Sequence, residues 1–261
     1  MDMFLFQVFL PFILSALVVI IVMFIAENYG SKVGGILGTL PSTIVVAFVA
    51  IAYTEGTNFA SEAALVVPAE LGINVLFLFV FALLIHRSVV GAFVITFAVW
   101  SVLSLLLVYG YINNIVLSLL IYVVCAIISF IILEKKVKIP SMGKVVIHYT
   151  IRKMIFRGVL AGVVIALAVL LSQVGSVISG IFSVFPAILS STMLISVREH
   201  GPDFAAGMAK TMMLGLSSVA TYATVIHLLY PLYGVIIGSV IAYIASFCVT
   251  LGIFFIRKNI L

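Results

Sequence analysis

The sequence predicts an all-α polytopic membrane protein with nine transmembrane helices, arranged as an inverted 4+1+4 repeat. Three observations predict this architecture: the composition, the spacing of the apolar runs, and a pattern that occurs twice. Of the 261 residues, 65% are hydrophobic and only 8% are charged. A soluble domain of this size needs far more charge to cover its surface, so the chain belongs in a bilayer.

The apolar runs set the number of crossings. Each run is about 20 residues long, which is enough for a helix through a ~30 Å hydrocarbon core. The first run is expected to be a retained helix, because Met1-Asp2-Met3 lacks the positive charge that begins a signal peptide. The nine predicted spans are Phe4–Ala26, Val33–Thr54, Ala60–Leu84, Val89–Gly110, Ile115–Leu133, Gly158–Val174, Val177–Ser196, Phe204–Leu229 and Leu232–Ile256.

Lysine and arginine set the predicted orientation. The segment from Glu134 to Arg157 carries seven of these residues, so the positive-inside rule places it in the cytoplasm. Alternating the nine spans from this anchor places no lysine or arginine on the outer side. We therefore expect a cytoplasmic-membrane protein with its N-terminus outside and its C-terminus in the cytoplasm. The net charge of +5 follows from these loops and does not indicate nucleic-acid binding.

A pattern of glycine, proline and apolar residues occurs twice, 145 residues apart and without a gap. Because five predicted crossings separate equivalent helices, the second copy is expected to be inverted. Residues 1–111 then form the first four-helix repeat, 112–157 the linker helix with the basic cytoplasmic segment, and 158–261 the second repeat. The first copy contains Gly30-Ser31, Gly35-Ile36, Pro41, Gly56 and Phe59-Ala60; the second contains Gly175-Ser176, Gly180-Ile181, Pro186, Gly201 and Phe204-Ala205.

The matched prolines, Pro41 and Pro186, fall in the middle of predicted spans. Proline removes a backbone donor and frees carbonyl groups, which must face protein or a wet cavity at membrane depth. Ser42 and Thr43 follow the first proline, and Ser190 follows the second, so hydroxyls and carbonyls are available to a solute. Inverted repeats with broken helices are a known construction of secondary transporters. The alternative is that these prolines only bend their helices.

Glu70 is the carboxylate expected closest to the membrane midplane. A charge is costly there, so the group is expected to carry a coupling proton or to bind a cation. The alternative is a structural acid paired with Lys210. Asn74 lies one helical turn beyond Glu70, and Ser217 and Thr221 form part of a polar stripe in the second repeat. The predicted site therefore comprises Pro41, Ser42, Thr43, Glu70, Asn74, Pro186, Ser190, Ser217 and Thr221.

Signatures of catalysis and of metal or cofactor binding are not found in the sequence. Cys125 and Cys248 both lie in apolar runs, where cysteine is usually a packing residue. The spans contain no histidine or cysteine pair at metal-ligand spacing, and the chain has no P-loop or nucleophile elbow. We therefore expect a protein that is not an enzyme and that has no metal site or cofactor.

Each half resembles a small bacterial family. The segments from Gly35 to Pro41 and from Gly180 to Pro186, each followed by a turn near Gly56 or Gly201, are similar to the GlpM-type four-helix inner-membrane proteins of unknown function. Those proteins are about half this length, so the resemblance implies a fused pair of such units and names no substrate. More distantly, four-helix units acting in antiparallel pairs resemble the drug/metabolite transporter superfamily. The first span departs from that pattern, because it has no membrane-embedded acid like that of small multidrug exporters.

Together these features predict a secondary transporter that moves a small solute or ion by alternating access, coupled to a proton or another cation. Its expected partners are the lipid bilayer and that solute or ion, and the sequence does not determine an oligomeric state. Two alternatives remain open. One is a non-transporting scaffold or accessory protein of envelope biosynthesis, and the other is an ion channel.

Overall fold

The computed structural model describes residues 3–110, 112–139 and 150–260, and these residues are helical almost throughout. Residues 140–149 of the basic segment lie outside this part of the chain. The predicted all-α fold is confirmed, and the described ranges contain no strand. The elements are α1 (Met3–Thr39), α2 (Ser42–Glu55), α3 (Thr57–Leu84), α4 (Val89–Tyr109), α5 (Ile115–Ile131), the π-helical turn η1 (Ile132–Lys136), α6 (Ile151–Leu171), α7 (Ser176–Ser183) and α8 (Ala187–Ile260).

Six helical stretches in the described ranges are long and apolar enough to cross a membrane. Large apolar side chains on the outer surface are exposed, including Leu105, Val116 and Ile237. In water such a surface would aggregate, whereas in a bilayer it faces lipid. The prediction of a multi-pass membrane protein is therefore confirmed.

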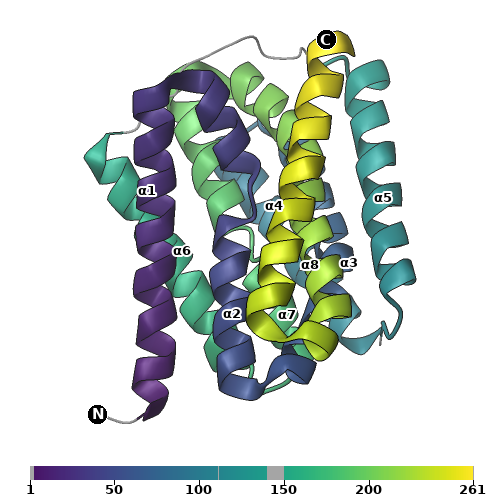
Figure 1. The fold of residues 1–261 in the computed structure, drawn as a ribbon. Coiled ribbons are helices and arrows are strands. Elements are labelled where there is room, and N and C mark those ends of the chain that lie inside the picture. The colour runs from purple at the N-terminus through teal and green to yellow at the C-terminus, as the bar shows by residue number, and fades with distance from the viewer. Residues whose placement is uncertain (1–2, 111, 140–149, 261) are drawn as a thin grey trace.

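Two of the helices change direction along their length. In α8, Gly201 has φ 83° and Gly234 has φ 73°, so the backbone leaves the helical conformation at both positions. Only glycine adopts such positive φ values without a steric penalty. The green-to-yellow ribbon of α8 accordingly turns at each end of the bundle, and the ribbon of α1 bends at the top before it descends toward α2 (Figure 1).

Helix α3 forms the centre of the bundle. Every residue from Val66 to Val75 is buried, and the helix contacts α4, α5, α7 and α8. A membrane helix that is buried all round packs only against protein, so its polar side chains must find partners on neighbouring helices. This position places Glu70 and Asn74 in the core.

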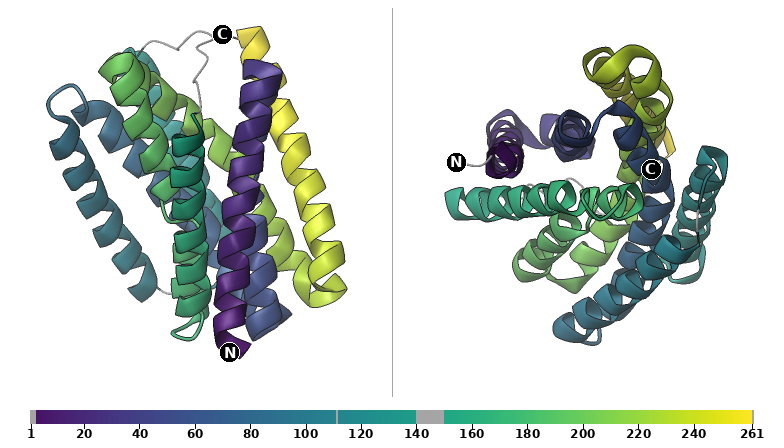
Figure 2. Two further views of the ribbon diagram at one scale, coloured as in Figure 1. Left: turned by 90° about the vertical axis from the view of Figure 1, so that its left-hand side faces the viewer. Right: turned by 90° about the horizontal axis from the view of Figure 1, so that it is seen from below.

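Helices α1 and α6 lie side by side and antiparallel (Figure 2). A Cβ atom added to Gly162 would lie 2.8 Å from the carbonyl oxygen of Phe12, and one added to Gly158 would lie 2.9 Å from that of Ala16. The two glycines, spaced four residues apart, let the helix backbones approach closely. Residues 158–162 meet residues 12–20 in reverse order, which fixes the antiparallel direction.

Both helices that contain a matched proline are interrupted there. Helix α1 ends at Thr39 and α2 begins at Ser42, while α7 ends at Ser183 and α8 begins at Ala187. The prediction that proline breaks these helices is confirmed. Two backbone hydrogen bonds recur at the breaks with the same 145-residue spacing: Ser42 N–H to Leu40 O (2.8 Å) with Ala187 N–H to Phe185 O (2.8 Å), and Val45 N–H to Pro41 O (3.2 Å) with Ser190 N–H to Pro186 O (2.8 Å).

The turns that follow the two breaks also match. Gly56 has φ 95° and ψ 163°, and Gly201, which lies 145 residues later, has φ 83° and ψ 176°. Each glycine separates the short helix after a break from the next long helix. The sequence pattern therefore has a counterpart in the backbone conformation.

Candidate functional site

Glu70 is fully buried on α3, with 0% of its surface exposed. Its carboxyl group accepts a hydrogen bond from the hydroxyl of Ser104 on α4, whose Oγ lies 2.9 Å from Oε1 and 3.1 Å from Oε2. Within the described part of the chain, no lysine, arginine or histidine lies within ion-pairing distance of this carboxyl group. Glu70 is therefore a buried acid held by a neutral partner.

Lys210 has a different acidic partner. Its ammonium group lies 2.6 Å from Oε2 of Glu134 and donates to the carbonyl oxygen of Ile139, also at 2.6 Å. The side chain of Lys210 is only 2% exposed, whereas that of Glu134 is 39% exposed. Lys210 thus joins the end of the linker segment to α8, and the alternative in which it pairs with Glu70 is wrong.

Pro68 perturbs α3 two residues before Glu70. The backbone N–H of Ala69 donates to the hydroxyl of Ser118 on α5, with a distance of 2.9 Å. Proline loosens the helical ladder around it, which frees neighbouring backbone groups to bond outside the helix. The linker helix α5 therefore stabilises the part of α3 that carries Glu70.

We expect Ser118→Ala to lower the free energy of unfolding by about 1 kcal/mol, because it removes the buried hydroxyl that accepts from the Ala69 N–H. Thermal unfolding in detergent measures the effect. Ser101→Ala, at an exposed position on α4, is the control and should change stability little. Equal melting temperatures for the two variants would show that the Ser118 hydrogen bond contributes nothing.

Asn74 connects α3 to the second helix break. Its side-chain Nδ2 donates to the carbonyl oxygen of Val184 at 2.8 Å, between the end of α7 and the start of α8. This carbonyl is one of those that the Pro186 break releases from helical bonding. Asn74 is 1% exposed, and its Oδ1 atom has no hydrogen-bond partner within the described residues.

Aromatic side chains enclose the same region. The ring of Trp100 on α4 packs edge-to-face against that of Phe185, with centroids 4.8 Å apart. Phe97, also on α4, lies 6.1 Å from Phe185 between ring centroids. The Trp100 indole N–H is near the Glu70 carboxyl group but outside hydrogen-bond geometry. The aromatic rings exclude water, which strengthens every electrostatic interaction inside.

The structure brings together only part of the predicted site. Glu70, Asn74 and the Pro186 break form one cluster, while Ser217 receives a hydrogen bond from Tyr122 of α5 at 3.1 Å. The Thr221 hydroxyl donates to the carbonyl oxygen of Ser217, as hydroxyls on apolar helices commonly do. Ser217 and Thr221 thus make their described bonds to α5 and to their own helix.

The serines at the two breaks also differ in their bonding. The Ser190 hydroxyl donates to the carbonyl oxygen of Pro186 at 2.6 Å, so it satisfies an acceptor at the break itself. At the first break, Pro41 is buried, and the half-buried Ser42 and Thr43 begin α2. Helix α2, which follows the first break, packs against α6, α7 and α8.

Two residues of this cluster, Trp100 and Ser104, were not predicted. Trp100 is the single tryptophan of the chain, and Ser104 follows it by one helical turn. A tryptophan in the middle of a span is unusual, because this residue prefers the membrane–water interface. That position, together with a serine on the same helix face, is the signal that could have identified α4 as a wall of the site.

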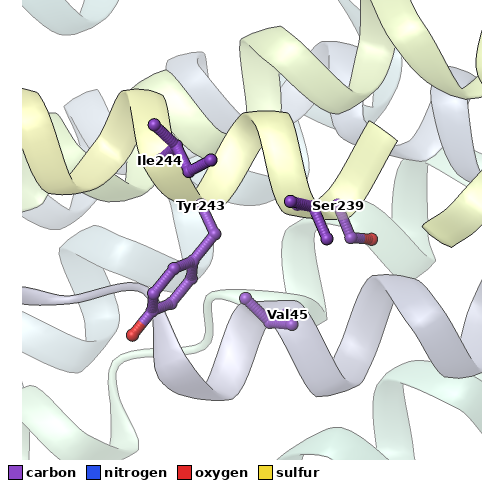
Figure 3. A pocket seen from close by; sticks show the side chains of 5 residues that line it. Val45, Ser239, Tyr243 and Ile244 are labelled. Carbon is purple, nitrogen blue, oxygen red and sulfur yellow. The ribbon is translucent and has the colours of Figure 1, made fainter. Parts of the chain in front are cut away.

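Two apolar hollows lie outside this cluster. One, of about 300 Å³, is lined in part by Phe97, Phe185 and Ser190, and so borders the second break. The other, of about 340 Å³, lies between α2 and the last part of α8, where Tyr243 extends from α8 beside Val45 of α2 (Figure 3). Neither hollow is lined by Glu70 or Asn74, so the buried acid is enclosed by protein.

The cluster is thus a buried carboxyl group, a hydroxyl, an amide and an interrupted helix, contributed by α3, α4 and the α7–α8 break. Such groups can hold a proton or a small cation, and a rearrangement of the break changes the contact between Asn74 and Val184. No family model, curated protein or solved structure matches this chain.

Proposed function

We propose that the protein is a secondary transporter that moves a small solute or ion by alternating access at a site between two inverted repeats. The observation that carries this proposal is the contact between Asn74 and Val184. It joins α3, whose buried carboxyl group pairs with no described lysine, arginine or histidine, to the broken helix of the other proposed repeat. Glu70 and Asn74 lie on the same helix, so a shift of α3 that follows a change in the charge of Glu70 also alters the Asn74–Val184 contact at the break.

The matched backbone geometry supports the inverted repeat. Both helix breaks carry the same hydrogen bonds, Gly56 and Gly201 share one conformation, and α1 and α6, which the repeat pairs with each other, are antiparallel. In the proposed topology, α8 contributes three passes because it turns at Gly201 and Gly234. The bend in α1 (Figure 1) supplies one more pass, so the proposed topology has nine crossings with the two termini on opposite sides.

The cost of burying a charge favours reversible binding of a proton or a cation at Glu70. An ionised carboxylate at membrane depth costs several kcal/mol unless a proton or a cation compensates for it. A group that alternates between these states stabilises different arrangements of its surroundings, because each state has its own preferred contacts. The interrupted helices can bend at their breaks, because the backbone there has few helical hydrogen bonds that bending would disrupt.

One observation favours a second candidate, the non-transporting scaffold. Glu70 is enclosed by protein and bonded to Ser104, as a purely structural acid would be. In the transporter proposal the same arrangement is an occluded state. The two candidates differ in whether the breaks become accessible to water.

Accessibility of the breaks to a thiol reagent tests the proposal without knowledge of the substrate. Ser42→Cys and Ser190→Cys are introduced into a chain whose own Cys125 and Cys248 are replaced by serine, and the protein is reconstituted in sealed liposomes. We expect a membrane-impermeant reagent to label both positions from either face, while the liposomes retain an ion gradient. No labelling from either face supports the scaffold, and labelling with loss of the gradient supports a pore.

Two exposed positions calibrate the assay. Asn113→Cys, in the loop before α5, and Arg87→Cys, in the turn after α3, lie on opposite sides in the predicted topology. Each should react from one face only, and from different faces. If both controls reacted from the same face, the nine-crossing topology would be wrong.

A further inference from the structure

The atoms around Glu70 that can bind a ligand are oxygens. They are the Glu70 carboxylate and the Asn74 Oδ1 on α3, the Ser104 hydroxyl on α4, and the Val184 carbonyl at the second break. Oxygen ligands of this kind suit hard cations such as those of the alkali and alkaline-earth metals. Glu70 and Asn74 are four residues apart on one helix, so their side chains share a face.

Acceptors outnumber donors in this cluster. Among the described residues, the Glu70 carboxyl group receives a hydrogen bond from the Ser104 hydroxyl, and the Val184 carbonyl receives one from Asn74 Nδ2. The Trp100 N–H lies near the carboxyl group but outside hydrogen-bond geometry. The Oδ1 of Asn74 is buried and receives none within the described residues. A buried acceptor without a partner is costly. A positive charge beside Glu70 and Asn74 would satisfy both groups.

The charge of the cluster selects the valence of the cation. Glu70 is the one acidic side chain in it, so a monovalent cation gives a neutral site, whereas a divalent cation leaves an uncompensated positive charge. Uncompensated charge is expensive in a water-excluding environment lined by Trp100 and Phe185. Carbonyl groups freed at broken membrane helices are suitable ligands for such an ion.

We propose that Glu70, Asn74, Ser104 and the Val184 carbonyl bind a single dehydrated alkali cation, for which sodium is the probe. This inference rests on the proposed transport function, in which the cation is the coupling ion. The ligands come from α3, from α4 and from the break before α8. Binding therefore favours the arrangement in which the three elements are together, and release of the ion permits the break to move.

Direct binding of radioactive sodium to the purified protein in lipid nanodiscs tests the site. Choline chloride replaces sodium chloride to keep the ionic strength constant. We expect saturable binding, with an affinity that falls about ten-fold or more in Glu70→Gln and in Asn74→Ala, because each change removes an interaction with a charged group. The side chains of Gln and Glu are nearly the same size, so the Glu70→Gln variant retains the packing.

The same helix offers matched controls. Glu62→Gln and Asn58→Ala make the same chemical changes at exposed positions of α3 and should bind sodium as the parent protein does. If the Glu70 variant does not fold, Ser104→Ala provides the measurement and should also weaken binding. Unchanged affinity in both Asn74→Ala and Ser104→Ala overturns the proposal.

Two further outcomes separate the ion site from the transport function. Saturable sodium binding without labelling at Ser42→Cys or Ser190→Cys retains the site and rejects the carrier. Labelling from both faces without sodium binding rejects the site and retains the carrier. If sodium does not bind and acidification alone changes the labelling, Glu70 is a proton site and the proposal for an alkali cation is wrong.

Discussion

Replacing Gly180 with alanine should lower the free energy of unfolding by about 2–3 kcal/mol, although alanine is the better helix former by about 1 kcal/mol. An added Cβ at this position would lie 2.2 Å from the carbonyl oxygen of Ala63 and 2.8 Å from Cγ2 of Val66. The first of these atoms belongs to the backbone of the central helix α3 and cannot rotate away. Helix α7 must therefore move outward, which also disturbs the break that follows it.

Gly252→Ala is the matched control for this prediction. Gly252 lies in α8, and an added Cβ would meet no atom within 4 Å. Thermal unfolding in detergent should give a lower melting temperature for the Gly180 variant and an equal or higher one for the Gly252 variant. Equal melting temperatures for the two variants would mean that α7 does not pack against α3 as closely as described.

Removing the carboxylate that neutralises Lys210 should have an effect of similar size. We expect Glu134→Gln to lower the free energy of unfolding by about 2–3 kcal/mol, because the buried ammonium group keeps its charge but loses the carboxylate of Glu134. Breaking a fully buried ion pair costs about 3–5 kcal/mol. The expected loss is smaller here because Glu134 is 39% exposed and water partly screens its charge.

A second ion pair provides the comparison. Lys153 and Glu199 form a pair whose side chains are 26% and 27% exposed, so Glu199→Gln should lower stability by no more than about 1 kcal/mol. Adding Lys210→Met to Glu134→Gln removes the buried charge and should restore most of the lost stability. If the double variant is less stable than Glu134→Gln alone, the effect comes from packing and not from the buried charge.

The sequence predicted the features whose cause is local. Pro41 and Pro186 interrupt their helices because each proline acts on its own backbone, whatever surrounds it. Gly56 and Gly201 mark turns because a positive φ strongly favours glycine. The burial of Glu70 followed from its place in the middle of an apolar run.

The partners of these residues depend on long-range packing and could not be predicted from local patterns. Glu70 bonds to Ser104, 34 residues away, and Asn74 to Val184, 110 residues away. The alternative in which Lys210 pairs with Glu70 is wrong, because Lys210 bonds to a more accessible acid, Glu134. In the polar stripe, the Thr221 hydroxyl donates to a carbonyl of its own helix. Sequence spacing alone does not distinguish a hydroxyl bonded in this way from one that faces a binding site.

The linker helix α5 also has a role that its sequence does not reveal. This helix has no partner in the predicted repeat. In the structure, Ser118 accepts from the backbone of α3, and Tyr122 donates to Ser217 of α8. Helix α5 therefore connects α3 to α8 through side-chain hydrogen bonds, although most of its own surface is exposed.

The contacts of α3 also constrain the order in which the chain can mature during its synthesis. When this helix enters the bilayer, the acceptor for its Ala69 amide is still 49 residues away in the growing chain, and the carbonyl that receives Asn74 is 110 residues away. Until those segments arrive, the polar groups of α3 lack the partners that they have in the finished bundle. Biogenesis therefore finishes only after the ribosome has passed Val184, and a chain truncated before that residue should be a substrate for membrane quality control.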